Sequence, residues 1–174
     1  KDITVPFHAS TQCSIRDSKR ALEYQALGCS RIILERALPL EQIREICSSV
    51  DCEVEFFVHG ALCVCYSGEC LLSERVDGRS ADRGECIQAC RSLYKLEDET
   101  GKVLLKDKAI LSLKDYRLLE RLEDIANAGV CSFKIEGRLK NETYVRNVVR
   151  EYSQALDALI EKSGGQYERA SFGK

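Results

Sequence analysis

Five of the ten cysteines in this 174-residue chain crowd into 28 residues: Cys63, Cys65, Cys70, Cys86 and Cys90. Four of them have the spacing Cys63-x6-Cys70-x15-Cys86-x3-Cys90, which gives two pairs of thiols. Four thiolates can hold a zinc ion or an iron–sulfur cluster. Zinc sites favour two tight pairs, and only the second pair is tight, so the spacing favours a cluster over zinc. A set of free buried thiols is the remaining alternative.

Charged side chains alternate with apolar ones in two segments that are expected to be strands. In 132–138, Lys134, Glu136 and Arg138 share one face. In 53–59, Glu55 and His59 share one face in the same way. Charges on the inner face of a barrel must be paired or must bind a ligand. The segments therefore indicate either an internal salt-bridge network or a pocket in which Lys134 and Arg138 bind a carboxylate or phosphate.

Two other kinds of active site lack support in the sequence. The chain contains no Gly-x-Ser-x-Gly elbow and no His-Glu-x-x-His helix, which argues against a serine-triad hydrolase and a zincin protease. His8 and His59 are the only histidines. Cys63 could act as a nucleophile beside His59, but the neighbouring cysteines favour a metal ligand instead.

Alternating strands and helices must position these residues. The expected strands cover 3–8, 31–35, 53–59, 109–113 and 131–137. The expected helices cover 18–27, 39–50, 115–128 and a long final segment capped by Asn141. Segment 92–106 is expected to form an inserted β-hairpin. This order predicts an α/β fold with a parallel sheet.

The number of βα units sets the predicted domain organisation. A closed (β/α)₈ barrel needs about 250 residues, so we expect a partial TIM-like barrel with about five βα units. This domain would cover 1–163, with a cysteine-rich loop at 60–91 and the hairpin at 92–106, followed by a flexible tail at 164–174. The chain has no Met, which indicates a fragment of a longer chain. A missing N-terminal barrel segment or a second copy is expected to cover the open sheet edges.

Composition restricts the partners and the compartment. The net charge of −2 gives no general attraction to nucleic acid or anionic membranes. Any RNA contact must come from local basic residues, and the alternative is a solvated loop. The candidates near the cysteines are Arg75, Arg79, Arg83, Arg91 and Lys95. The sequence shows no membrane span and no signal peptide, so we expect a cytoplasmic protein without membrane partners.

Several motifs carry a family resemblance. They lie at His8–Gln12, Glu55–Cys63, Tyr66–Ser73, Gly78–Ser80, Arg83–Cys86, Cys90–Arg91, Leu111–Asp115 and Phe133–Arg138. Together they resemble the collagenase-like peptidases of unassigned catalytic type, and 78–91 is most similar to the branch that hydroxylates RNA with prephenate. The resemblance implies a modified TIM barrel and a 4Fe–4S cluster on Cys63, Cys70, Cys86 and Cys90. Cys131 is a reserve ligand, because ligand sets differ between branches.

Three functions follow from the resemblance and the residues together. The first is an iron–sulfur enzyme that hydroxylates a pyrimidine of tRNA or rRNA with prephenate as co-substrate. Its candidate catalytic residues are Glu55, His59, Lys134, Glu136 and Arg138. The second is a collagenase-like protease, with or without a metal, that acts on denatured collagen or peptides. The third is a non-enzymatic, metal-bearing scaffold that a partner completes.

Overall fold

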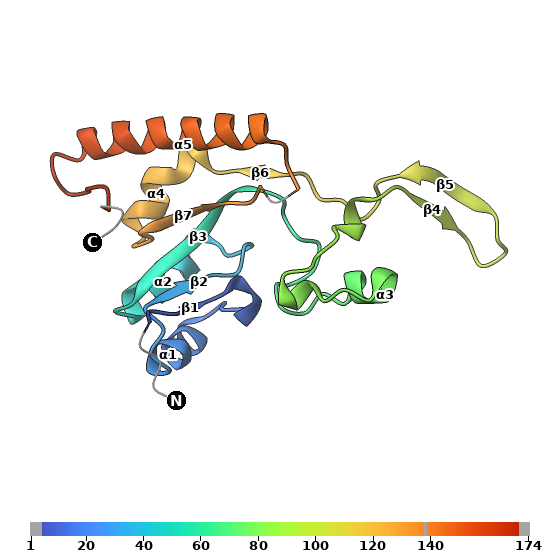
Figure 1. Cartoon of the computed structure of the whole chain (residues 1–174), viewed down its shortest axis with the longest axis horizontal. Helices are drawn as coiled ribbons and strands as arrows, with labels where there is room; N and C mark the ends of the chain where they lie inside the picture. The colour runs from blue at the N-terminus through green and yellow to red at the C-terminus, as the bar shows by residue number, and fades with distance from the viewer. Residues whose placement is uncertain (1–4, 138, 171–174) are drawn as a thin grey trace.

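A mixed α/β fold is seen in the computed structural model, which describes residues 5–137 and 139–170 (Figure 1). Strands β1 (His8–Ala9), β2 (Arg31–Ile33) and β3 (Glu53–Gly60) are parallel neighbours. Strand β7 (Ser132–Ile135) also runs parallel to β3. Strand β6 (Tyr116–Arg117) pairs antiparallel with the C-terminal end of β3. Strand β3 is therefore the centre of the sheet. The described strands do not close into a barrel.

Two of the helices begin at a capping side chain. Asp17 caps α1 (Ser18–Ala26), and Asn141 caps α5 (Glu142–Lys162), in each case by accepting a backbone N–H bond. Helix α2 (Leu40–Ser49) follows Pro39, which fixes the chain direction before the first turn. Helix α4 (Leu122–Asn127) completes the layer that α2 and α5 form beside the sheet (Figure 1).

One face of β3 forms the core. Val54, Phe56 and Val58 are at most 2% exposed and belong to the same buried cluster as side chains of α2, α4 and α5. The Tyr152 hydroxyl of α5 donates to the Val58 carbonyl at 2.7 Å and accepts from the Leu118 N–H at 3.2 Å. This bond pair fixes α5 against the central strand, which leaves the other face of the sheet for charged residues.

The cysteine segment (61–91) follows β3 and has little regular structure. It contains α3 (Leu72–Asp77) and the short 3₁₀ turns η2 (Ala81–Arg83) and η3 (Ala89–Arg91). The predicted hairpin is confirmed as β4 (Tyr94–Glu97) and β5 (Val103–Lys108), which project from the body of the molecule (Figure 1). The Asp98 carboxylate closes the turn by accepting the N–H groups of Thr100 and Lys102.

Three predicted elements differ from the structure. The strand at 3–8 is reduced to β1, with residues 1–4 outside the described range. The strand at 109–113 is absent, and β6 lies further along the chain. The helix expected from 115 begins only at 122, after the turn η4 (Leu119–Arg121). The physical reason is that the Leu118 N–H donates to the Val58 carbonyl, which holds 116–118 in the sheet.

The chain end is partly described. Within the predicted flexible tail, the Arg169 guanidinium donates to Asp157 at 2.7 Å and to Ser153.

None of the helices in the described ranges has the length and hydropathy needed to cross a membrane.

Candidate functional site

A single cavity beyond the end of β3 brings the predicted ligands together. Its wall contains Cys63, Cys70, Cys86 and Cys90, as well as Cys65. The four predicted ligands come from different parts of the cysteine segment, before α3, between η2 and η3, and within η3. Only the tertiary fold of this segment makes them neighbours.

Two close backbone approaches fix the cysteine segment on the sheet. A Cβ atom on Gly60 would lie 2.6 Å from the Glu136 carbonyl oxygen, and one on Gly68 would lie 2.2 Å from the Gln12 carbonyl oxygen. Both glycines also have positive φ, so a side chain is disfavoured both by the close contact and by the backbone conformation. The Gln12 carboxamide accepts from the Gly68 N–H at 3.0 Å and donates to the Ala81 carbonyl at 3.1 Å. Gln12 therefore holds the segment at two points.

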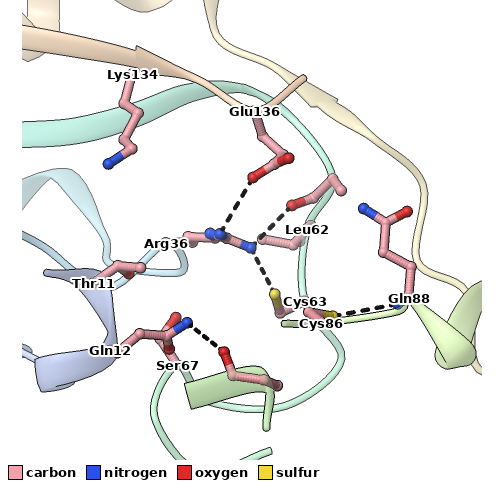
Figure 2. A network of polar contacts seen from close by, with 12 residues as sticks. Thr11, Gln12, Arg36, Leu62, Cys63, Ser67, Cys86, Gln88, Lys134 and Glu136 are labelled. Atoms are coloured by element: carbon pink, nitrogen blue, oxygen red, sulfur yellow. Dashed lines mark hydrogen bonds and ion pairs between the residues drawn. The ribbon is translucent and has the colours of Figure 1, made fainter. Parts of the chain in front are cut away.

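Arg36 lies at the centre of the site, and the sequence analysis did not identify it. Its Nη1 is 2.6 Å from Cys63 Sγ and 3.4 Å from the Ala61 oxygen, and its Nη2 is 3.8 Å from Glu136 Oε2 (Figure 2). The guanidinium also stacks 4.2 Å from the centre of the Phe57 ring. Burial raises the pKa of the Cys63 thiol, and the Arg36 charge opposes that rise. One sequence signal could have identified Arg36: it follows a predicted strand directly, and active sites of β/α barrels lie at the C-terminal ends of their strands.

Arg91 was expected to contact RNA, but its guanidinium points into the fold. It donates to the carbonyls of Leu62 at 3.3 Å and Leu113 at 3.1 Å, and it lies 3.0 Å from the Asp115 carboxylate. Burial raises the pKa of the adjacent Cys90 thiol, and the Arg91 charge opposes the rise. Arg91 therefore links the peptide before Cys63 to the turn that carries Cys90.

The other predicted RNA-binding side chains are exposed. Arg75 and Arg83 form no ion pair within the part of the chain that the structure describes. Arg79 makes a long contact of 3.9 Å with Asp77. Lys95 lies on β4 and is paired within that strand. Arg75, Arg79 and Arg83 are thus accessible side chains of the cysteine segment.

Glu55 and Lys134 meet on the charged face of the sheet, as the alternation predicts. Glu55 Oε1 is 3.1 Å from Lys134 Nζ, and Oε2 accepts from Ser132 Oγ at 2.7 Å and lies 3.4 Å from Arg31. Burial tends to raise the pKa of Glu55, but the bonds from Ser132 and Lys134 outweigh it and the pKa is lowered. This is the internal ion-pair network that the sequence allowed, and Lys134 remains partly exposed within it.

His59 departs from the predicted alternation. The pairing of β3 with β7 shifts register between Phe57 and His59, so the imidazole contacts α5. Its Nε2 lies 2.9 Å from the Tyr144 hydroxyl, and its ring packs edge-on to Tyr152. Burial lowers the pKa of His59. The imidazole is not part of the wall of the cysteine cavity.

The remaining predicted site residues have different locations. Glu136 lines the cavity. Cys131 lies just before β7, where its thiol donates to the Val54 carbonyl at 3.5 Å, and it is not part of the cavity wall. Arg138 lies outside the described residues.

The donor set can be compared with the two proposed inorganic groups. Among the residues in 5–137 and 139–170, no three His, Cys, Asp or Glu side chains are arranged to hold one metal ion. A zinc ion requires four thiolates around a single point, whereas in a 4Fe–4S cube each thiolate binds a different iron, further from the others. Four thiols line one cavity together with Arg36 and Arg91, and these thiols are the side chains that could hold an inorganic group.

Comparison with known proteins gives several matches. The model of peptidase family U32 matches residues 1–172. The chain is 48% identical over 170 residues to a 23S rRNA 5-hydroxycytidine synthase of Escherichia coli, covering 98% of this chain and 26% of that protein. It is 37% identical over 160 residues to a tRNA hydroxylation protein of Bacillus subtilis, covering 88% and 38%. It is 33% identical over 186 residues to a collagenase of Porphyromonas gingivalis, covering 99% and 44%.

These matches cover most of this chain but less than half of each relative's length. No solved structure matches the chain with significance.

Proposed function

This chain belongs to peptidase family U32, and we propose that it is part of an iron–sulfur enzyme that hydroxylates a pyrimidine base of rRNA or tRNA. The observation that carries the proposal is the shared cavity of Cys63, Cys70, Cys86 and Cys90. The relatives support the reaction class, since two of them are named for hydroxylated rRNA or for tRNA hydroxylation.

Each residue of the cavity has a definable role in this proposal. The four cysteines would hold a 4Fe–4S cluster as thiolates, and such a cluster supplies electron transfer. Arg36 donates to Cys63 Sγ and so stabilises the thiolate form. Glu136 in turn orients Arg36 through the 3.8 Å contact. Phe57 and the surrounding chain shield the guanidinium from water, which strengthens both contacts.

The co-substrate in the proposal is prephenate, an anion. Lys134 and Arg138 are the proposed anchors for its carboxylates, because the sequence alternation in 132–138 predicts one charged face for both. The Lys134 side chain is 41% exposed, so a ligand can reach it without disrupting the core. Its bond to Glu55 holds the ammonium in position in the free protein.

The test uses the full-length protein prepared without oxygen. It is incubated with unmodified tRNA or rRNA, with and without prephenate, and the nucleosides are analysed by mass spectrometry. We expect a pyrimidine nucleoside heavier by one oxygen atom, formed only with prephenate. Cys63→Ser should abolish this product, and the matched control Cys131→Ser should not. A wild-type protein with a full complement of iron that forms no such product would refute the proposal.

A protease is the second candidate, favoured by the collagenase name of one relative. Such an enzyme needs a nucleophile with a nearby base, and His59 lies against α5 rather than in the cysteine cavity. Glu55 would be the remaining base, although its lowered pKa makes it a weak one. Chelator-sensitive cleavage of gelatin that is lost in Glu55→Ala would favour this function over RNA hydroxylation.

A further inference from the structure

Tyr66 is an exposed aromatic residue in the wall of the cysteine cavity. It is 57% exposed, and it follows Cys65 directly. The Arg16 guanidinium lies over its ring, 3.8 Å from the centroid. Arg16 is itself fixed, because it donates to Glu69 at 2.7 Å and to Ser14 at 2.6 Å. The ring is therefore held in one orientation while much of its surface stays open to a ligand.

Gln88 adds an unused hydrogen-bonding group to the same cavity. Its backbone has φ of 55°, in the left-handed region, and its N–H donates to Cys86 Sγ at 3.4 Å (Figure 2). The side-chain carboxamide has no hydrogen-bond partner within the described part of the chain. A non-glycine residue in this conformation is uncommon and costs about 1 kcal/mol or more, which points to a functional constraint at this position.

We propose that Tyr66 and Gln88 form the site that receives the target base, an unpaired pyrimidine. Enzymes that modify a base take it out of the stack, and they recognise it by stacking on aromatic side chains and by hydrogen bonds to its edge. Tyr66 offers the flat surface, and the Gln88 carboxamide offers two N–H donors and an acceptor oxygen. This inference rests on the proposed function, since it names the substrate-recognition groups of that same cavity.

The exposed arginines fit the same substrate. Arg75 and Arg83 lie on the cysteine segment with no ion-pair partner among the described residues, which leaves them available to phosphates. A peptide substrate would not require an aromatic ring and an open carboxamide in one cavity together with exposed guanidinium groups on the same segment. The chemistry of the cysteine segment therefore favours a nucleic acid over a peptide.

The test measures binding of a short single-stranded RNA to the full-length protein by fluorescence anisotropy. One RNA carries a central cytidine, and a second RNA has an abasic site at that position. We expect Tyr66→Ala to weaken binding of the first RNA by between about fivefold and about a hundredfold, the usual range for one stacked base. Tyr66→Phe, which keeps the ring, and the distant control Tyr167→Ala should stay within about twofold of wild type.

Binding of the abasic RNA by wild-type protein is a readout that needs no variant. Wild-type protein should bind it more weakly than Tyr66→Ala binds the cytidine RNA, because the abasic RNA lacks both the stacking and the hydrogen bond, and Tyr66→Ala should show no further loss on the abasic RNA. Gln88→Leu should weaken binding of the cytidine RNA by about three- to tenfold and leave the abasic RNA unaffected.

The outcomes separate this inference from the proposed function. Suppose that wild-type protein hydroxylates RNA but binds the two RNAs equally well, or that Tyr66→Ala has no effect on binding. Either result would overturn the base site alone. A wild-type protein that neither binds nor hydroxylates RNA would overturn both. Equal weakening of gelatin binding by Tyr66→Ala would replace the base site with a peptide site.

Discussion

The ten cysteines form two groups of five with different surroundings. In the cysteine segment they line a cavity, and arginine side chains lie against them. The other five are Cys13, Cys29, Cys47, Cys52 and Cys131. Cys29 belongs to the hydrophobic core, and Cys13, Cys47 and Cys52 pack against it. The same residue type therefore serves as a small apolar side chain in one region and as a candidate ligand in the other.

The difference lies in the neighbours of the thiols. Burial raises the pKa of the Cys47 thiol to about 11, and the Cys131 thiolate adds to that rise. Burial also raises the pKa of Cys63, but there Arg36 acts in the opposite direction. A thiol must lose its proton to bind a metal, so a nearby guanidinium favours ligation. A neighbouring cation therefore distinguishes the Cys63 thiol from the Cys47 thiol, although both are affected by burial.

The largest expected effect concerns bound iron. Single changes of Cys63, Cys70, Cys86 or Cys90 to serine should remove almost all iron and sulfide from protein prepared without oxygen, because serine is a poor ligand for iron–sulfur clusters. Cys131→Ser should retain the wild-type content. Iron and sulfide are measured per chain. Loss of iron in Cys131→Ser, or retention of iron in the serine variants of Cys63, Cys70, Cys86 and Cys90, would contradict the division into two groups.

Gly68→Ala should displace the cysteine segment. The added Cβ would lie 2.2 Å from the Gln12 carbonyl oxygen, and φ is +80°. We expect about 3 kcal/mol lower unfolding free energy in urea titrations. Gly78→Ala is the matched control, since its φ is also positive but nothing lies within 4 Å, and it should cost about 1 kcal/mol. Equal costs for the two variants would show that the close approach to Gln12 does not matter.

Glu55→Gln should destabilise the protein by about 2 kcal/mol at neutral pH, since it removes the charge that pairs with Lys134 and Arg31. The pKa of Glu55 is lower in the folded state than in the unfolded chain, where it is about 4.3. The stabilisation by the Glu55 carboxylate is therefore complete above that unfolded-state pKa, and it is lost as the pH falls through the folded-state pKa. The difference between variant and wild type should therefore shrink in urea titrations below about pH 4.

Glu53→Gln is the control for this prediction, because the Glu53 side chain is 56% exposed. It should change the unfolding free energy by less than about 0.5 kcal/mol. A difference between Glu55→Gln and wild type that stays constant down to pH 3 would mean that the ion pairs with Lys134 and Arg31 contribute nothing.

The smallest expected effect lies in the second cysteine group. Cys29→Ala should lower the unfolding free energy by about 1 kcal/mol, because it removes one sulfur atom from a site that is 6% exposed. Its iron content should equal that of wild type. A fall in iron content in this variant would show that the two groups are coupled.

Local sequence patterns account for most of the regular elements and for the choice of candidate ligands. The alternation in 53–59 and 132–138, the cap Asn141 and the hairpin at 92–106 depend on residues close in sequence, and β3, β7, α5 and the β4–β5 hairpin follow them. The grouping of the cysteines was visible in the same way, since five of them lie within 28 residues.

Tertiary structure alone decided the contacts between distant residues. The register shift that turns His59 to α5 depends on pairing with β7, and the late start of α4 depends on the bond from Leu118 to Val58. Arg36 reaches Cys63 across 27 positions. Such contacts are set by packing between segments far apart in the chain, so a local pattern can suggest a candidate position such as Arg36 but does not identify its partner.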